Sequence, residues 1–318
     1  MRRLRTYRIE LTLVLVLFAA VAFFAYLGYG LVQADTAQQT FSGERAFDNV
    51  KTQLAFGPRV TGSPESERYR DWLTTELTSK GWNVMLQSFL VSDDNLRAQN
   101  VIAVPVATAA EGALIILGAH YDSRLFADRD PNATKKEQPT PGANSGASAV
   151  AVLLELARVL KTQDLNYRVC LAFFDASDNG GIAGWRPAEG SSYFAENMAS
   201  DTPQCSSPSA VVILDTIGSA EELTFEQSST ENLVTALRNT ADDLGYENWL
   251  DNRPGPVAVA DHIPFLRGGF SSIFILDAKY EHRHMSTDTL DKVSVDNLQR
   301  TGDTLKHWLE EVVEVKVQ

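Results

Sequence analysis

Apolar residues recur along this chain in two arrangements, as short continuous runs and as longer stretches with helical spacing. Short apolar runs that end in polar residues are typical of strands buried on both faces of a sheet. The runs that predict strands are residues 83–91, 98–107, 112–123, 167–177, 209–218 and 271–278. Helical spacing predicts helices over residues 65–80, 147–160, 190–199, 230–244 and 295–312. Strands that alternate with helices predict an α/β fold with helices on both faces of the sheet.

The first 33 residues follow a different pattern. Four arginines stand within the first eight residues, and no charged residue occurs from Leu11 to Val32. A helix needs about 20 such residues to cross a bilayer, whereas a secretory signal core usually has roughly 7–15. The stretch therefore predicts a membrane anchor. Val32-Gln33-Ala34 would suit a signal peptidase, so a cleaved signal is the alternative.

These features divide the chain into four predicted parts. A basic cytoplasmic segment (1–10) and a transmembrane anchor (11–33) precede a polar tether (34–45) and one globular domain (46–318). The anchor makes the cell membrane the expected location. Because basic flanks stay in the cytoplasm, the N-terminus is expected on the cytoplasmic side. The arrangement would be single-pass, with residues 11–32 in the membrane and the C-terminal domain extracytoplasmic.

Composition argues against one class of partner, but it does not decide whether the two cysteines form a disulfide. The chain of 318 residues has a net charge of −13 and no basic block beyond residue 8, so no nucleic-acid partner is expected. Cys170 lies in a predicted buried strand, where packing is its expected role. A disulfide between Cys170 and Cys205 is the other possibility, because spacing alone does not decide the pairing.

Polar residues gather just past the ends of three predicted strands. They are His120 and Asp122, the segment from Asp175 to Asp178, and Asp215. In open α/β sheets, ligands bind in the crevice beyond the carboxyl ends of the strands. Helix capping or loop solvation would explain one such cluster, but three that converge favour a site.

Histidine is scarce and concentrated near these clusters. The chain has five histidines, and four of them lie in the motifs HYD (120–122), DH (261–262) and HRH (282–284). A histidine with an aspartate two residues later can bind a metal while the carboxylate orients the ring. A Ser-His-Asp hydrolase is the competing chemistry, but no G-x-S-x-G elbow follows a predicted strand.

An ordered series of motifs carries a family resemblance. In chain order the motifs are AFGPRVTGSPESERYRDWLTTELTSKGWNV, GAHYDS, PGANSGASAVAVLLELARVL, LAFFDASDNGGIAGW, VVILDTIG, DHIPFLRGG and HMSTDTLDKVS. From about residue 45 to the end, the chain resembles the glutaminyl-peptide cyclotransferases (glutaminyl cyclases) and their relatives, the co-catalytic zinc aminopeptidases. The spacer from Trp185 to Phe194 and the DHIPFL turn are more similar to the cyclases. The resemblance implies a three-layer sandwich around a mixed central sheet, as in zinc exopeptidases.

The resemblance also implies zinc and a set of site residues. In the cyclases, zinc polarises the γ-carboxamide of an N-terminal glutamine, and a glutamate moves a proton from the attacking amine to the leaving ammonia. Matched by position, Asp178 and His284 correspond to metal ligands. Asp215 and Asp261 correspond to two aspartates of the catalytic hydrogen-bond network.

A second set of positions comes from the aminopeptidases and the pocket. His120 matches the histidine that binds a second metal in the aminopeptidases, with Asp122 as its His-x-Asp partner. Trp185, Arg283 and Asp122 are expected at the substrate pocket.

Three positions depart from the family pattern. Ser145 stands where the family has the ligand aspartate of G-A-x-D, and Ser177 stands where the acid/base glutamate precedes the second ligand. Arg283 replaces the tryptophan that usually precedes the metal-binding histidine. A neutral hydroxyl is a poor zinc ligand. Loss of the acid/base group costs about 10²–10⁴ in rate.

We therefore predict a membrane-anchored protein similar to glutaminyl cyclases and zinc aminopeptidases, with a pocket for peptide or protein N-termini and with impaired catalysis. The alternative is an active zinc-dependent cyclotransferase or aminopeptidase, in which water or Asp122 takes over the roles of the missing metal ligand and acid/base group. A serine hydrolase that uses Ser177 or Ser145 with a nearby histidine is a third hypothesis.

Overall fold

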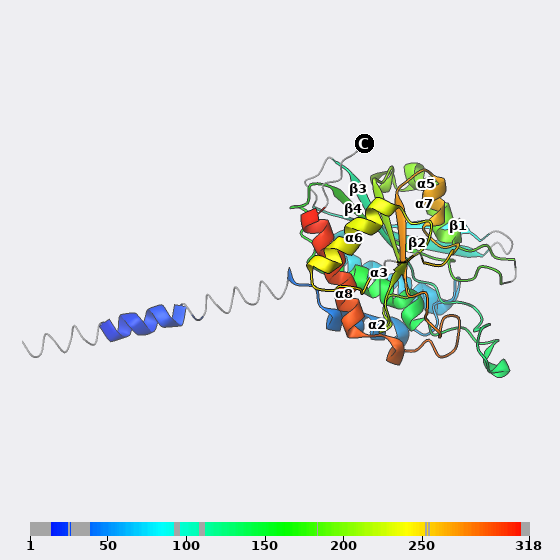
Figure 1. Cartoon of the computed structure of the whole chain (residues 1–318), viewed down its shortest axis with the longest axis horizontal. Coiled ribbons are helices and arrows are strands. Elements are labelled where there is room, and N and C mark those ends of the chain that lie inside the picture. Colours follow the sequence, from blue (N-terminus) through cyan, green and yellow to red (C-terminus); the bar gives the residue numbers. More distant parts are fainter. Residues whose placement is uncertain are drawn as a thin grey trace, which may run out of the picture. The chain divides into compact units, whose positions relative to one another are not determined.

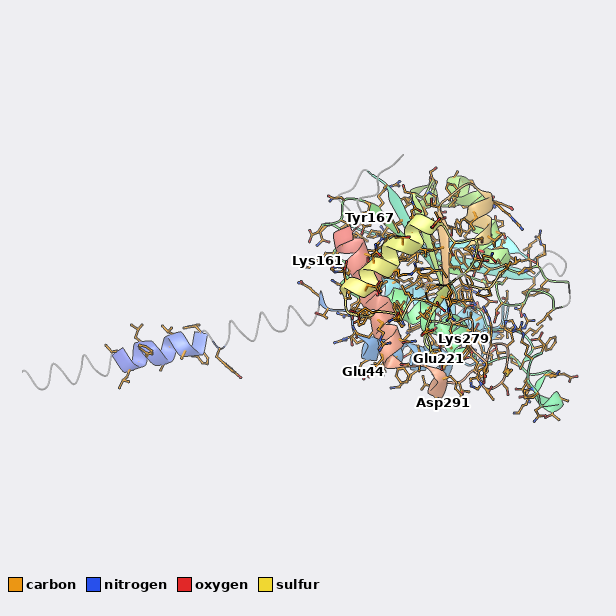
Figure 2. All side chains as sticks on the ribbon, in the orientation of Figure 1. Glu44, Lys161, Tyr167, Glu221, Lys279 and Asp291 are labelled. Carbon is orange, nitrogen blue, oxygen red and sulfur yellow. A yellow bond between two sulfur atoms is a disulfide. The ribbon has the colours of Figure 1, made fainter. Side chains whose placement is uncertain are left out.

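The computed structural model describes residues 14–24, 26, 39–91, 96–107, 112–182, 184–251, 253 and 255–312. The chain forms two compact units, 1–40 and 41–318. In the first unit, residues 14–24 form a helix whose large apolar side chains are exposed (Figure 2). The remainder of the predicted 11–32 anchor, residue 26 apart, lies outside the described residues. Within the described part of the chain, no helix has both the length and the apolar character that a membrane crossing requires.

The second unit is built on a seven-stranded mixed sheet, as the resemblance implies. The strand order is β1-β2-β4-β3-β5-β7-β6. The strands are β1 (Trp82–Leu90), β2 (Arg97–Pro105), β3 (Leu114–His120), β4 (Arg168–Phe174), β5 (Ala210–Asp215), β6 (Thr224–Phe225) and β7 (Ser272–Leu276). The central strands β4, β3, β5 and β7 are parallel, whereas β1, β2 and β6 pair antiparallel at the edges.

The central strands are continuous apolar runs because both faces of the sheet are covered. Along β3, Ile115, Leu117 and Ala119 pack into the larger core. Leu114 and Ile116 pack into the smaller core on the opposite face. This alternation follows from the two-residue period of a strand, and it confirms the three-layer arrangement.

Helices cover both faces of the sheet (Figure 1). The larger core receives side chains from five helices: α2 (Gly43–Ala55), α3 (Pro64–Ser79), α4 (Ala149–Val159), α6 (Glu231–Asp243) and α8 (Val295–His307). The smaller core receives side chains from α5 (Glu189–Asp201) and α7 (Ile263–Arg267). The 3₁₀ turns are Ala133–Lys135, Pro203–Cys205 and Leu290–Lys292, and the π-helical turns are Ala143–Ser148 and Trp308–Val312.

The folded unit begins earlier than the predicted tether allows. Ser42 caps α2, because its side chain accepts a hydrogen bond from the backbone N–H of Arg45. Phe41 is buried against Gly302 of α8, where a Cβ atom would overlap the Phe41 ring. Residues 41–45, predicted as tether, are therefore part of the folded unit.

The two cysteines form a disulfide, so packing is not the whole role of Cys170. Cys170 of β4 is bonded to Cys205 in the 3₁₀ turn after α5. The sequence did not decide this pairing because the turn reaches β4 only through the tertiary fold.

Removal of the disulfide should destabilise the folded unit. The bond closes a loop with a sequence separation of 35 residues, and loops of this size contribute about 2–4 kcal/mol. We expect Cys170→Ala with Cys205→Ala to lower the free energy of unfolding by that amount in urea titrations. With reductant present, the native protein should unfold at the same urea concentration as the double variant. If reductant left the urea midpoint of the native protein unchanged, the result would contradict the disulfide.

Candidate active site

A cavity of about 220 Å³ lies beyond the carboxyl ends of β3, β4 and β5. Its wall contains seven of the predicted site residues: His120, Ser177, Asp178, Asp215, Asp261, Arg283 and His284. Asp122, Ser145 and Trp185 are not part of the wall. A larger hollow of about 290 Å³ beside α6 has no histidine in its lining. The smaller cavity is therefore the candidate site, because the polar groups converge there.

His120, at the end of β3, lies between two carboxylates. Its Nε2 is 3.2 Å from Oδ1 of Asp215, and its Nδ1 is 3.3 Å from Oδ1 of Asp122. Burial lowers the pKa of His120, but attraction to Asp215 and hydrogen bonds to both carboxylates outweigh burial, so its pKa is raised well above the ordinary value. The two carboxylates therefore favour the protonated, cationic form of the ring.

His284 and Asp178 form the second imidazole–carboxylate pair. Nε2 of His284 is 2.9 Å from Oδ1 of Asp178, and the hydroxyl of Ser145 is 3.4 Å from Oδ2 of the same carboxylate. Burial raises the pKa of Asp178, but the charge and hydrogen bond of His284, together with the charges of His120 and Arg283, outweigh burial and hold that pKa below its ordinary value. His284 reaches this position from a left-handed backbone conformation, with φ of 62°.

Arg283 pairs with the aspartate that also faces His120. One guanidinium nitrogen, Nη2, donates to Oδ2 of Asp215. Burial raises the pKa of Asp215, but the charges of Arg283 and His120 outweigh burial and lower it. Asp215 therefore holds two cations, one on each oxygen.

Ser177 is hydrogen-bonded to the other network aspartate. The hydroxyls of Ser177 and Ser191 donate to Oδ1 of Asp261 at 2.8 and 2.6 Å. Burial raises the pKa of Asp261 to about 6. Neither Ser177 nor Ser145 has a hydrogen bond to a histidine among the described residues, so the geometry gives no support to a serine hydrolase.

Asp122 and Trp185 lie outside the cavity and shape it indirectly. The carboxylate of Asp122 accepts the backbone N–H groups of Ser177 and Asp178, each at 3.1 Å. Trp185 packs beside Phe89 and Ala176 in a small apolar cluster. The structure thus places both predicted pocket residues behind the wall.

His262 also lies away from the site. Its Nε2 is 2.9 Å from Oε2 of Glu226, and its ring stacks on Phe274 at 5.1 Å between centroids. His262 is fully buried. The DHIPFL turn therefore contributes Asp261 to the cavity and uses the histidine for packing.

The loop that presents Ser145 is held by Arg59 and Asp288. The buried Arg59 guanidinium donates to the carbonyl oxygens of Tyr121, Pro141 and Gly142. Asp288 accepts the backbone N–H groups of Asn144 at 2.8 Å and Ser145 at 3.2 Å. Neither Arg59 nor Ser191 was expected from the sequence, because no spacing distinguishes them from ordinary turn and helix residues.

The donor set does not fit a zinc ion held by three protein ligands. His120 with Asp215, and Asp178 with His284, form two separate pairs. No three His, Cys, Asp or Glu side chains within the described residues are grouped to hold one metal ion. Catalytic zinc sites supply three such ligands. The hydroxyl of Ser145 does not replace the missing anionic oxygen.

Known proteins share this fold and these elements. Residues 100–309 match Peptidase family M28, and the chain belongs to that family. The chain is 24% identical over 232 residues to aminopeptidase YwaD of Bacillus subtilis, with 69% of this chain and 46% of YwaD covered. This chain therefore spans about half the length of YwaD.

Two further similarities are to glutaminyl cyclases. The chain is 28% identical over 286 residues to the glutaminyl-peptide cyclotransferase of Bos taurus, with 76% of each protein covered. It matches the crystal structure of Tannerella forsythia glutaminyl cyclase with a TM-score of 0.77 and 28% identity, over 86% of this chain and 99% of that chain. Within the zinc exopeptidase family, the chain is a glutaminyl cyclase-like member.

Asp288 should be important for the stability of the Ser145 loop. In Asp288→Asn, one of the two backbone N–H groups loses its carboxylate oxygen inside the protein, at a cost of about 1–3 kcal/mol. We expect this loss in the free energy of unfolding. Asp291→Asn is the matched control, because Asp291 lies at the surface (Figure 2). An equal effect of the two substitutions would contradict the role of Asp288.

Asp261 should make stability depend on pH. Its pKa rises from 3.8 to about 6 in the folded protein, so the folded state binds the proton more tightly than the unfolded state. Stability therefore falls as pH rises between about 4 and 6, by up to about 3 kcal/mol. We expect the difference in unfolding free energy between the native protein and Asp261→Asn to decrease over this interval. A difference that is constant with pH would contradict the raised pKa.

Proposed function

We propose that this protein is a membrane-anchored, glutaminyl cyclase-like pocket protein that binds peptide or protein N-termini and has impaired zinc-dependent catalysis. The observation that carries the proposal is the internal pairing of the site. Asp178 is paired with His284, Asp215 with Arg283, and Asp261 with Ser177. Among the described residues, these pairs leave a cavity but no set of three metal ligands.

The binding part of the proposal is supported by the relatives and by the cavity. An aminopeptidase and a glutaminyl-peptide cyclotransferase are similar to this chain, and both are named for action on peptides. In this chain Asp178 and Asp261 line the cavity and offer carboxylate oxygens to an α-ammonium group. The cavity wall therefore retains acceptors suited to a peptide N-terminus.

An active zinc-dependent cyclotransferase or aminopeptidase is the second candidate. It is favoured by the position of Asp261, whose pKa of about 6 is near that of an effective general base. The hydroxyl of Ser177 links Asp261 to the cavity, so a proton could pass between a bound amine and this carboxylate.

Zinc content and turnover distinguish the two candidates. We expect the full chain, purified in detergent, to hold less than one zinc per molecule and to release no ammonia from a glutaminyl peptide. It should also show no aminopeptidase turnover, while calorimetry detects peptide binding. Ser145→Asp with Ser177→Glu should gain at least about 10²-fold in turnover, because both missing groups return. Native turnover that is abolished by a chelator and by His284→Ala would establish the active enzyme.

The membrane location is part of the proposal and has its own test. The uncharged stretch from Leu11 to Val32 supports it, and so does the disulfide, because disulfides persist mainly outside the cytoplasm. We expect protease added to intact cells to degrade residues 41–318. Full protection in intact cells, with degradation after lysis, would contradict an outward-facing domain.

A further inference from the structure

The cavity contains three carboxylates and needs positive charge to balance them. Asp178, Asp215 and Asp261 all line it, and each has less than a tenth of its side-chain or residue surface exposed. Unpaired buried carboxylates are costly, so such clusters contain a bound cation or basic side chains. In this chain the basic residues of the cavity wall are His120, His284, Arg283, Arg129 and Arg124, of which Arg124 is paired with Asp128.

Arg283 differs from the two histidines because most of its donors are unused. A guanidinium has five N–H donors in a planar fork. Among the described residues, Asp215 is the one hydrogen-bond acceptor of the Arg283 side chain. That side chain lines the cavity and is 24% exposed. Its remaining N–H groups are therefore available to a ligand in the cavity.

Arg129 adds positive charge at the same wall without pairing with the three carboxylates. Arg129 is exposed and lines the cavity, and its backbone N–H donates to the carbonyl of His284 at 3.3 Å. Within the described residues its side chain has no ion-pair partner. The wall near Arg283 therefore has a cation that no carboxylate neutralises.

We propose that Arg283 takes the place of a metal ion in this cavity, and that its guanidinium binds an acidic first residue of a peptide. Arg283 neutralises Asp215 on one side and offers a donor fork to a ligand oxygen on the other. A side-chain carboxylate accepts two parallel charge-assisted bonds from such a fork, whereas a carboxamide has a single oxygen. The inference rests on the proposed peptide binding. It adds that binding needs no zinc and favours glutamate over glutamine at the first position.

The experiment compares two peptides on the full chain in detergent, with EDTA present and with zinc added. The peptides are Glu-Ala-Phe-amide and Gln-Ala-Phe-amide, and calorimetry measures both dissociation constants. We expect the native protein to bind the glutamyl peptide at least about tenfold more tightly, with the same ratio in EDTA and in zinc. Arg283→Gln should bring the ratio close to one.

Arg129→Gln is the matched control for charge. It removes the same charge from the same cavity but no contact with Asp215, so it should lower the glutamate preference far less than Arg283→Gln does. Arg283→Lys keeps the charge without the fork, and it should also lose most of the glutamate preference. If Arg283→Gln does not fold, as judged by its thermal unfolding, the lysine variant decides the question.

The outcomes separate this inference from the proposed function. Absence of binding for both peptides would overturn the proposed function as well. Binding that requires zinc, equal affinity for the two peptides, or a preference retained in Arg283→Lys would overturn the role of Arg283 alone. Zinc titration gives an independent measure, because Arg283→Gln should free Asp215 and bind zinc more tightly than the native protein. An unchanged zinc affinity would count against the replacement of a metal by the guanidinium.

Discussion

Balance of buried charge is the constraint on which this site depends. The parallel strands β4 and β5 lead into carboxylates that line one cavity at the end of the sheet, where their side chains are mostly buried. Buried ionised groups persist only with partners of opposite charge or with several hydrogen-bond donors. Each of the three carboxylates is stabilised by a different set of partners. Asp178 has an imidazole, Asp215 has a guanidinium and an imidazolium, and Asp261 has two hydroxyls and a raised pKa.

The same constraint explains why the substitutions fit one another. An aspartate at position 145 would add negative charge 3.4 Å or so from Asp178, where a metal ion would be needed to hold both carboxylates together. Serine lowers that charge, and Arg283 supplies a fixed cation nearby. The loop around Ser145 nevertheless keeps its shape, because Arg59 and Asp288 bind its backbone and not its side chains.

Much of this architecture could be predicted from the sequence. Continuous apolar runs identified the central strands, because burial on both faces leaves no room for polar alternation. The ends of parallel strands meet at one edge, so the convergence of His120, Asp178 and Asp215 followed from their positions just past three predicted strands. The fold and the clustering of the site residues could therefore be predicted from the sequence.

Other features could not be predicted, because they depend on side-chain direction or on contacts between distant segments. Neither the pairing of Arg283 with Asp215 nor the left-handed conformation of the adjacent His284 is signalled by residue type. Trp185 was expected at the pocket, but it packs behind the wall. The two-residue strand β6 is too short to show any periodicity.

The junction of the two ends of the folded unit has a mechanical consequence. Phe41 is buried on α8, the backbone N–H of Gly43 donates to Gln299 at 2.6 Å, and the same glutamine donates to the Phe41 carbonyl. A pulling force applied at the N-terminal end of the unit would therefore load the contact between α2 and α8 first.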